Sequence, residues 1–64
     1  MQRLGQAIGR LEPRQRAVFI ATELNGMSFR VLSEQWHEPL GTLLSRKSRA
    51  VKALRGMLKD FVDE

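Results

Sequence analysis

Apolar residues recur along the chain every three or four positions, which is the spacing of amphipathic α-helices. Proline and glycine divide this pattern into four segments. We predict helices over about residues 2–10, 13–25, 29–36 and from 39 to about 60. No segment alternates apolar and polar residues over a useful length, so no strand is predicted. The pattern therefore indicates an all-α fold, a small four-helix domain.

The residues between these segments are typical of helix boundaries. Pro13 and Pro39 stand where a helix can begin, because the fixed φ and missing N–H of proline cost nothing in a first turn. Gly26 can take the left-handed conformation that ends the second helix. Ser28 can then cap the third helix with its hydroxyl.

A projection at about 100° per residue assigns a buried face to each helix. The residues expected to face the core in the first three helices are Leu4, Ile8 and Leu11, then Ala17, Ile20, Ala21 and Leu24 with Val18 on the flank, then Phe29, Leu32 and Trp36. Phe19 points away from the others of its helix, so we expect the second helix to be covered on more than one side.

The fourth helix is the longest, and its two sides differ sharply. Its predicted apolar stripe comprises Leu40, Leu43, Ala50, Leu54, Met57, Leu58 and Phe61. The opposite side carries Ser45, Ser48, Arg49, Lys52, Arg55 and Lys59. Lys47 projects into the apolar stripe, where we expect a buried stem and an amine that reaches the surface. Leu44 and Val51 lie on the flank, where burial is incomplete.

The third and fourth helices are joined by only two residues, His37 and Glu38, which gives a helix-turn-helix pattern. The expected core of this motif comprises Leu32, Ser33, Trp36 and Leu43. Ser33 has to be small because the second helix of the motif passes close over it. The turn at His37 favours glycine, because a left-handed conformation is cheapest there. In such motifs the second helix, here the long C-terminal one, is the recognition helix and enters the DNA major groove.

The net charge of +4 on 64 residues is concentrated in the predicted recognition helix. Residues 1–38 hold five basic and four acidic side chains, whereas residues 39–59 hold six basic side chains and no acidic one. Such a block of one sign indicates a polyanionic partner, for which double-stranded DNA is the candidate. The alternative is a solvated helix face without a partner.

Composition excludes several other classes of function. There is no cysteine, and the single histidine, His37, has no nucleophile or carboxylate placed with it. We therefore expect no metal, no cofactor, no small-molecule substrate and no enzymatic activity. No apolar run approaches the length of a membrane span, and the N-terminus lacks the apolar block of a signal peptide. The expectation is a soluble, cytoplasmic protein with one domain over residues 1–64.

Three stretches carry a family resemblance: "LEPRQR", "NGMSF" and "PLGTLLSRKSRA". The last is similar to the signature P-[VI]-G-T-[VL]-x-S-R-x-x-R-A. Over about residues 8–58 the chain resembles region four of bacterial RNA polymerase sigma factors, especially the extracytoplasmic-function type. The resemblance implies recognition of the minus-thirty-five promoter element and binding to the flap of the polymerase β subunit. An anti-sigma factor is a further candidate partner.

The resemblance also implies roles for individual residues. The positions that would contact bases are Leu44, Ser45, Ser48 and Arg49, and Arg46 would contact a phosphate. Three further cations, Lys52, Arg14 and Arg16, are candidate phosphate contacts, although each is also explained as a solvated side chain.

The chain departs from the family pattern at three positions. His37 replaces the usual turn glycine, so either it accepts the strained conformation at some cost or the turn differs. Leu44 and Val51 stand where many relatives carry Lys or Arg. The half of a sigma factor that melts promoters is outside this sequence, so we expect an excised domain or a stand-alone relative. Two other functions stay open: another helix-turn-helix transcriptional regulator, and a protein-interaction module acting as an anti-sigma or polymerase-flap adaptor.

Overall fold

The computed structural model describes the backbone of residues 2–62 and the side chains of residues 4–59. The elements, in chain order, are α1 (Gln2–Gly9), α2 (Pro13–Phe19), η1 (Ile20–Leu24), α3 (Phe29–Trp36) and α4 (Leu40–Val62). η1 is a turn of π-helix that continues directly from α2. No strand occurs in the described part of the chain. The predicted all-α fold with a long C-terminal helix is confirmed.

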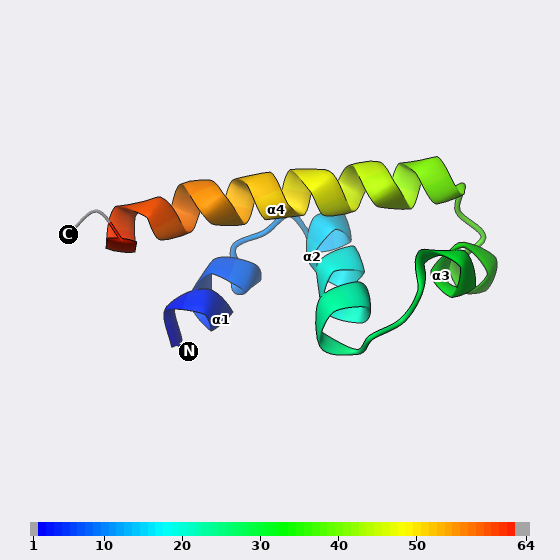
Figure 1. Ribbon diagram of the computed structural model, residues 1–64, viewed down its shortest axis with the longest axis horizontal. Helices are drawn as coiled ribbons and strands as arrows, with labels where there is room; N and C mark the ends of the chain where they lie inside the picture. Colours follow the sequence, from blue (N-terminus) through cyan, green and yellow to red (C-terminus); the bar gives the residue numbers. More distant parts are fainter. Residues whose placement is uncertain (1, 63–64) are drawn as a thin grey trace.

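α4 runs the whole length of the molecule, and the other helices lie along one side of it (Figure 1). α3 lies at its N-terminal end, α2 against its middle and α1 beneath its C-terminal half. The molecule therefore measures 42 × 18 × 16 Å. This arrangement leaves the opposite side of α4 uncovered along its length.

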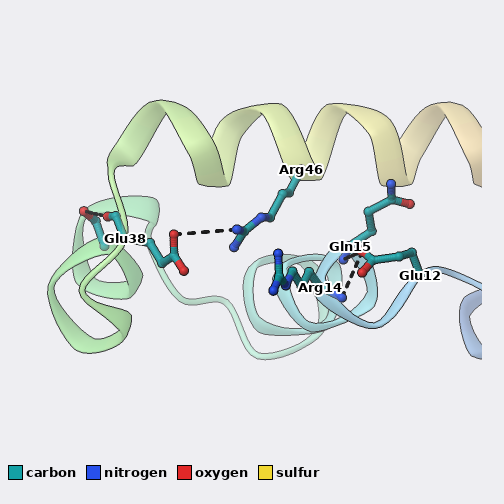
Figure 2. Close-up of polar contacts among 6 residues, drawn as sticks. Glu12, Arg14, Gln15, Glu38 and Arg46 are labelled. Atoms are coloured by element: carbon teal, nitrogen blue, oxygen red, sulfur yellow. Dashed lines mark hydrogen bonds and ion pairs between the residues drawn. The ribbon is translucent and has the colours of Figure 1, made fainter.

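The helix boundaries at Pro13, Gly26 and Ser28 follow the predicted chemistry, and Glu12 adds a cap that was not predicted. The Glu12 carboxylate accepts hydrogen bonds of 3.1 Å from the backbone N–H groups of Arg14 and Gln15, and so caps α2 just before Pro13 (Figure 2). The Ser28 hydroxyl accepts a hydrogen bond of 3.1 Å from the Val31 N–H and caps α3. Gly26 has a positive φ of 68°, as expected for the residue that ends a helix.

The second helix differs from its prediction in geometry and in its buried face. The Asn25 N–H bonds to the Ile20 carbonyl five residues earlier, at 3.0 Å, which is the π-helical pattern. Ala17 and Leu24, predicted to face the core, are exposed, and Leu24 is 61% exposed. The buried residues are Val18 and Ala21. Ala17 precedes the π turn and lies on the same side as Leu24 in the projection, so the error lies in the choice of the inward face, which Val18 and Ala21 occupy.

The core consists of two clusters that share α4. The N-terminal cluster comprises Ala7, Ile8 and Leu11 with Ala50 and Leu54 of α4. The motif cluster comprises Val18 and Ala21 with Leu32 of α3 and Leu43 of α4. α2 and η1 touch both, because Phe19 and Ile20 pack against the N-terminal cluster. The expectation that this helix is covered on more than one side is confirmed.

Three residues predicted to be buried lie at helix ends and stay partly exposed. Trp36, the last residue of α3, is 37% exposed, so its assignment to the core of the helix-turn-helix was wrong. Leu40, the first residue of α4, is 45% exposed, and Leu4 in α1 is also exposed. Side chains at the end of a helix lack a neighbouring turn to cover them on one side. Phe61 lies outside the residues whose side chains are described.

Candidate nucleic-acid interface

The turn between α3 and α4 is held by backbone and side-chain hydrogen bonds. His37 adopts the left-handed conformation (φ 55°, ψ 43°), and its N–H bonds to the Ser33 carbonyl. The Glu38 N–H bonds to the same carbonyl at 3.2 Å, while the Ser33 hydroxyl donates to the Glu38 carbonyl. Ser33 therefore fixes the turn chemically as well as leaving room for α4, a role that the sequence reasoning missed.

The two interior leucines of the motif are completely buried. Leu32 of α3 and Leu43 of α4 each have no exposed surface and meet in the motif cluster. Because they pack α4 against α3 and α2 from one side, the rotation of α4 about its own axis is fixed. The side chains opposite Leu43 must then face outward.

The four predicted base-contacting residues all lie on the exposed side of the first turns of α4. Ser45, Ser48 and Arg49 are exposed, and Leu44 is 47% exposed. Lys52 continues the same exposed face one turn further on. Hydroxyl groups and a guanidinium on one accessible helix face can hydrogen-bond to base edges or phosphates.

Arg46, predicted to contact a phosphate, is engaged within the molecule. Its guanidinium lies 3.6 Å from the Glu38 carboxylate, and the side chain is only 21% exposed. Figure 2 shows Arg46 extending from α4 toward Glu38, which immediately precedes Pro39 and α4. A phosphate contact by Arg46 therefore has to compete with Glu38.

Lys47 of α4 lies close to side chains of three other elements, α2, η1 and α3. Its amine lies 2.8 Å from the Glu23 carboxylate of η1 and 5.5 Å from the ring centroid of Phe29, with Phe19 on another side at 6.0 Å. The prediction that Lys47 lies in the apolar stripe is confirmed, because its side chain is 17% exposed. The amine ends in an ion pair, which the sequence reasoning did not foresee.

The two arginines at the start of α2 differ in their surroundings. Arg14 is exposed. Arg16 is half-buried, and its guanidinium donates a hydrogen bond of 2.9 Å to the Gly9 carbonyl at the end of α1. Arg14 is thus accessible to a phosphate, whereas Arg16 also holds α1 against α2.

The charge left for a partner is concentrated on α4. Within the described side chains, the two ion pairs use Arg46 and Lys47, and neither involves Arg49 or Lys52. No group of three metal-binding side chains occurs in the part of the chain that is described. None of its helices has the length and apolar character needed to cross a bilayer. The interface is therefore a cationic and hydroxyl-bearing helix face above an apolar core.

A family model described as sigma-70, region 4, matches residues 1–54 of the chain. The chain belongs to the sigma-70 region 4 family. A comparison with curated proteins found no match. Region 4 is a DNA-binding regulatory domain of sigma factors, not a known enzyme family. The domain therefore serves promoter recognition by a sigma factor, in interaction with DNA and RNA polymerase.

Proposed function

We propose that this region 4 domain, of the extracytoplasmic-function type, recognises the minus-thirty-five promoter element through α4 and docks on the flap of the polymerase β subunit. Residues 1–64 act as one domain. The observation that carries the proposal is the exposed face of α4, where Ser45, Ser48 and Arg49 project opposite the buried Leu43. Packing of Leu43 against α3 turns this face outward, away from the core.

Bases and phosphates are contacted by different residues in this proposal. Leu44, Ser45, Ser48 and Arg49 lie in the early turns of α4, which in a helix-turn-helix meet base edges. Lys52 and Arg14 are exposed and contact phosphates. Arg46 and Arg16 reach phosphates only by sharing or leaving their partners Glu38 and Gly9.

Exposed apolar side chains away from the α4 face support a protein contact. Leu24 at the end of η1 is 61% exposed, and Val31 on α3 is 41% exposed. They offer apolar surface to the β flap or to an anti-sigma factor without occupying the DNA-binding face. The adaptor function is the alternative, in which these contacts operate without recognition of DNA sequence.

The test compares Arg49→Ala with Lys59→Ala on two labelled duplexes at fixed salt. One duplex is selected by the chain from a random library, and the other has the same composition in scrambled order. Both side chains are exposed cations on α4, but Lys59 lies ten residues further along, about 15 Å away. Arg49 can donate a bidentate pair of hydrogen bonds to guanine, whereas Lys59 meets only backbone or water.

We expect Arg49→Ala to cost about 1–3 kcal/mol on the selected duplex and much less on the scrambled one. Lys59→Ala should weaken both slightly and equally. Equal losses for Arg49→Ala on both duplexes would contradict recognition of sequence by α4. The wild-type affinity should also fall steeply as salt rises, by a log–log slope of about −0.9 per phosphate contact. A flat salt response, together with binding of a β-flap fragment, would favour the adaptor function.

A further inference from the structure

Leu44 is an apolar side chain on the DNA-facing side of α4 that the core does not use. It is 47% exposed, whereas its neighbour Leu43 is completely buried. On a helical projection Leu44 lies about 40° from Ser48, which is one turn further on and exposed. An exposed leucine beside serines and cations suits a partner whose surface is both anionic and locally apolar.

The surroundings of Leu44 leave its outer side open. Gly41, one turn earlier, has no side chain, and a Cβ added there would meet nothing within 4 Å. Lys47, one turn later, is turned inward to Glu23 at 2.8 Å. Leu44 therefore projects as an apolar group, with Ser48 and Arg49 on the side toward the centre of the exposed face.

We propose that Leu44 packs against the C5 methyl group of a thymine in the major groove and gives the domain a preference for thymine at that place. This inference rests on the proposed function, because it takes α4 to be the helix that enters the groove. The methyl group of thymine is the apolar feature that base edges present in the major groove. The phosphates that flank the major groove are anionic and complement the exposed cations Arg49 and Lys52. A purely apolar protein surface would leave these cations without a partner.

The size of the effect follows from the burial of one methyl group. Removing such a group from a contact that excludes water should reduce affinity about fourfold. Substitution of deoxyuridine for thymidine removes the methyl group and leaves the hydrogen-bonding groups of the base unchanged. The substitution therefore isolates the contact that the proposal names.

The experiment selects a preferred duplex from a random library with the 64-residue chain and then replaces each thymidine by deoxyuridine, one at a time. We expect one thymine, or two adjacent ones, to lose about fourfold in affinity on replacement. The Leu44→Ala variant should bind the thymidine and deoxyuridine duplexes equally. Leu40→Ala is the matched control, because Leu40 is 45% exposed but lies about 80° from Ser48 in projection. This control should retain the fourfold difference.

Each other outcome overturns the inference, and the outcomes differ in whether the proposed function fails with it. The methyl contact would be disproved, while sequence recognition stands, if the selected site contains no thymine or if no deoxyuridine replacement lowers the affinity. It would also be disproved if the Leu44→Ala variant shows the same fourfold loss of affinity on replacement as the wild type. Loss of β-flap binding in Leu44→Ala, with no response to deoxyuridine, would assign Leu44 to a protein contact instead. A library selection with no preferred sequence would refute the proposed function, and this inference with it.

Discussion

His37 holds the one backbone conformation in the described chain that a side chain makes costly. Its φ of 55° is the only positive value at a residue other than glycine within residues 2–62. For an L-residue this conformation costs roughly 1–2 kcal/mol, although histidine adopts it more readily than most. The conformation persists because Ser33 forms two hydrogen bonds with Glu38: its carbonyl accepts from the Glu38 N–H, and its hydroxyl donates to the Glu38 carbonyl.

Replacing His37 with glycine should therefore stabilise the domain. We expect His37→Gly to raise the free energy of unfolding by about 0.5–1 kcal/mol, because relief of the left-handed strain exceeds the entropy that glycine adds to the unfolded chain. Urea unfolding followed by circular dichroism measures this difference. His37→Val, which is β-branched, should lower stability. A loss of stability in His37→Gly would show that the histidine side chain contributes more than its exposed position indicates.

At the residue scale, the sequence predicted the structure correctly where interactions between neighbouring residues determine it. The roles of Gly26 and Ser28 follow from backbone preferences and capping, which depend only on nearby residues. For His37 the structure decides between the two alternatives, because the residue adopts the left-handed conformation. Trp36 was misplaced because its burial depends on whether another element covers the end of α3. The periodicity of a helix does not contain that information.

At the scale of elements, Lys47 connects α4 to η1 and α3 through a chain of contacts. Its stem lies in the apolar stripe of α4, and its amine lies close to Glu23 and to the Phe29 ring. The Glu23 side chain is 53% exposed, so water weakens the ion pair. Most of the stabilisation should therefore come from the packed stem.

Two substitutions at Lys47 separate the stem from the charge. Lys47→Met keeps the length and apolar character of the stem, and we expect it to change the free energy of unfolding by less than about 1 kcal/mol. Lys47→Ala removes the stem and should cost about 2 kcal/mol, at the low end for truncation of a large buried side chain. Urea unfolding at low and high salt measures both. Equal destabilisation by Met and Ala would instead assign the energy to the amine.

The buried faces of α4 and α2 show what projection can and cannot determine for an element. α4 is long and regular, so a constant angle per residue placed Leu43, Ala50 and Leu54 correctly in the core. In α2 and η1 the inward face runs through Val18 and Ala21, whereas Ala17 and Leu24, which were predicted to face the core, lie beside it and are exposed. Apolar residues occur on several sides of this helix, so periodicity alone could not show which side the other helices cover.

At the scale of the whole molecule, the sequence predicted the position of the candidate interface but not the ion pairs within the molecule. The outward face of α4 follows from the pattern of apolar residues, because Ser45, Ser48 and Arg49 lie opposite the leucines. The engagement of Arg46 by Glu38 and of Lys47 by Glu23 could not be predicted, because ion pairs depend on the distances between elements. The sequence therefore predicts where charge can face a partner, but not which cations are already occupied.

The two hydrophobic clusters should unfold together although they lie along different parts of α4. α4 contributes Leu43 to the motif cluster and Ala50 and Leu54 to the N-terminal cluster. α2 and η1 also contact both, since Val18 lies in the motif cluster while the adjacent Phe19 packs against the other. Loss of one cluster removes part of the surface on which the other is built. So small a core is also only marginally stable, which leaves little room for a partly folded state.

A conservative substitution in the N-terminal cluster should accordingly lower the melting midpoint that is followed by Trp36 fluorescence, although Trp36 lies at the end of α3, the helix at the other end of the molecule. Ile8→Val removes one buried methylene group and should cost about 1 kcal/mol, lowering the melting temperature by about 4–8 °C. We expect the same shift whether melting is followed by far-ultraviolet circular dichroism or by Trp36 fluorescence. Leu24→Ala, at a residue 61% exposed, is the control that should move neither midpoint. A circular dichroism midpoint that falls while the Trp36 midpoint stays fixed would show that the helix-turn-helix folds without α1, and that the motif cluster alone positions α4.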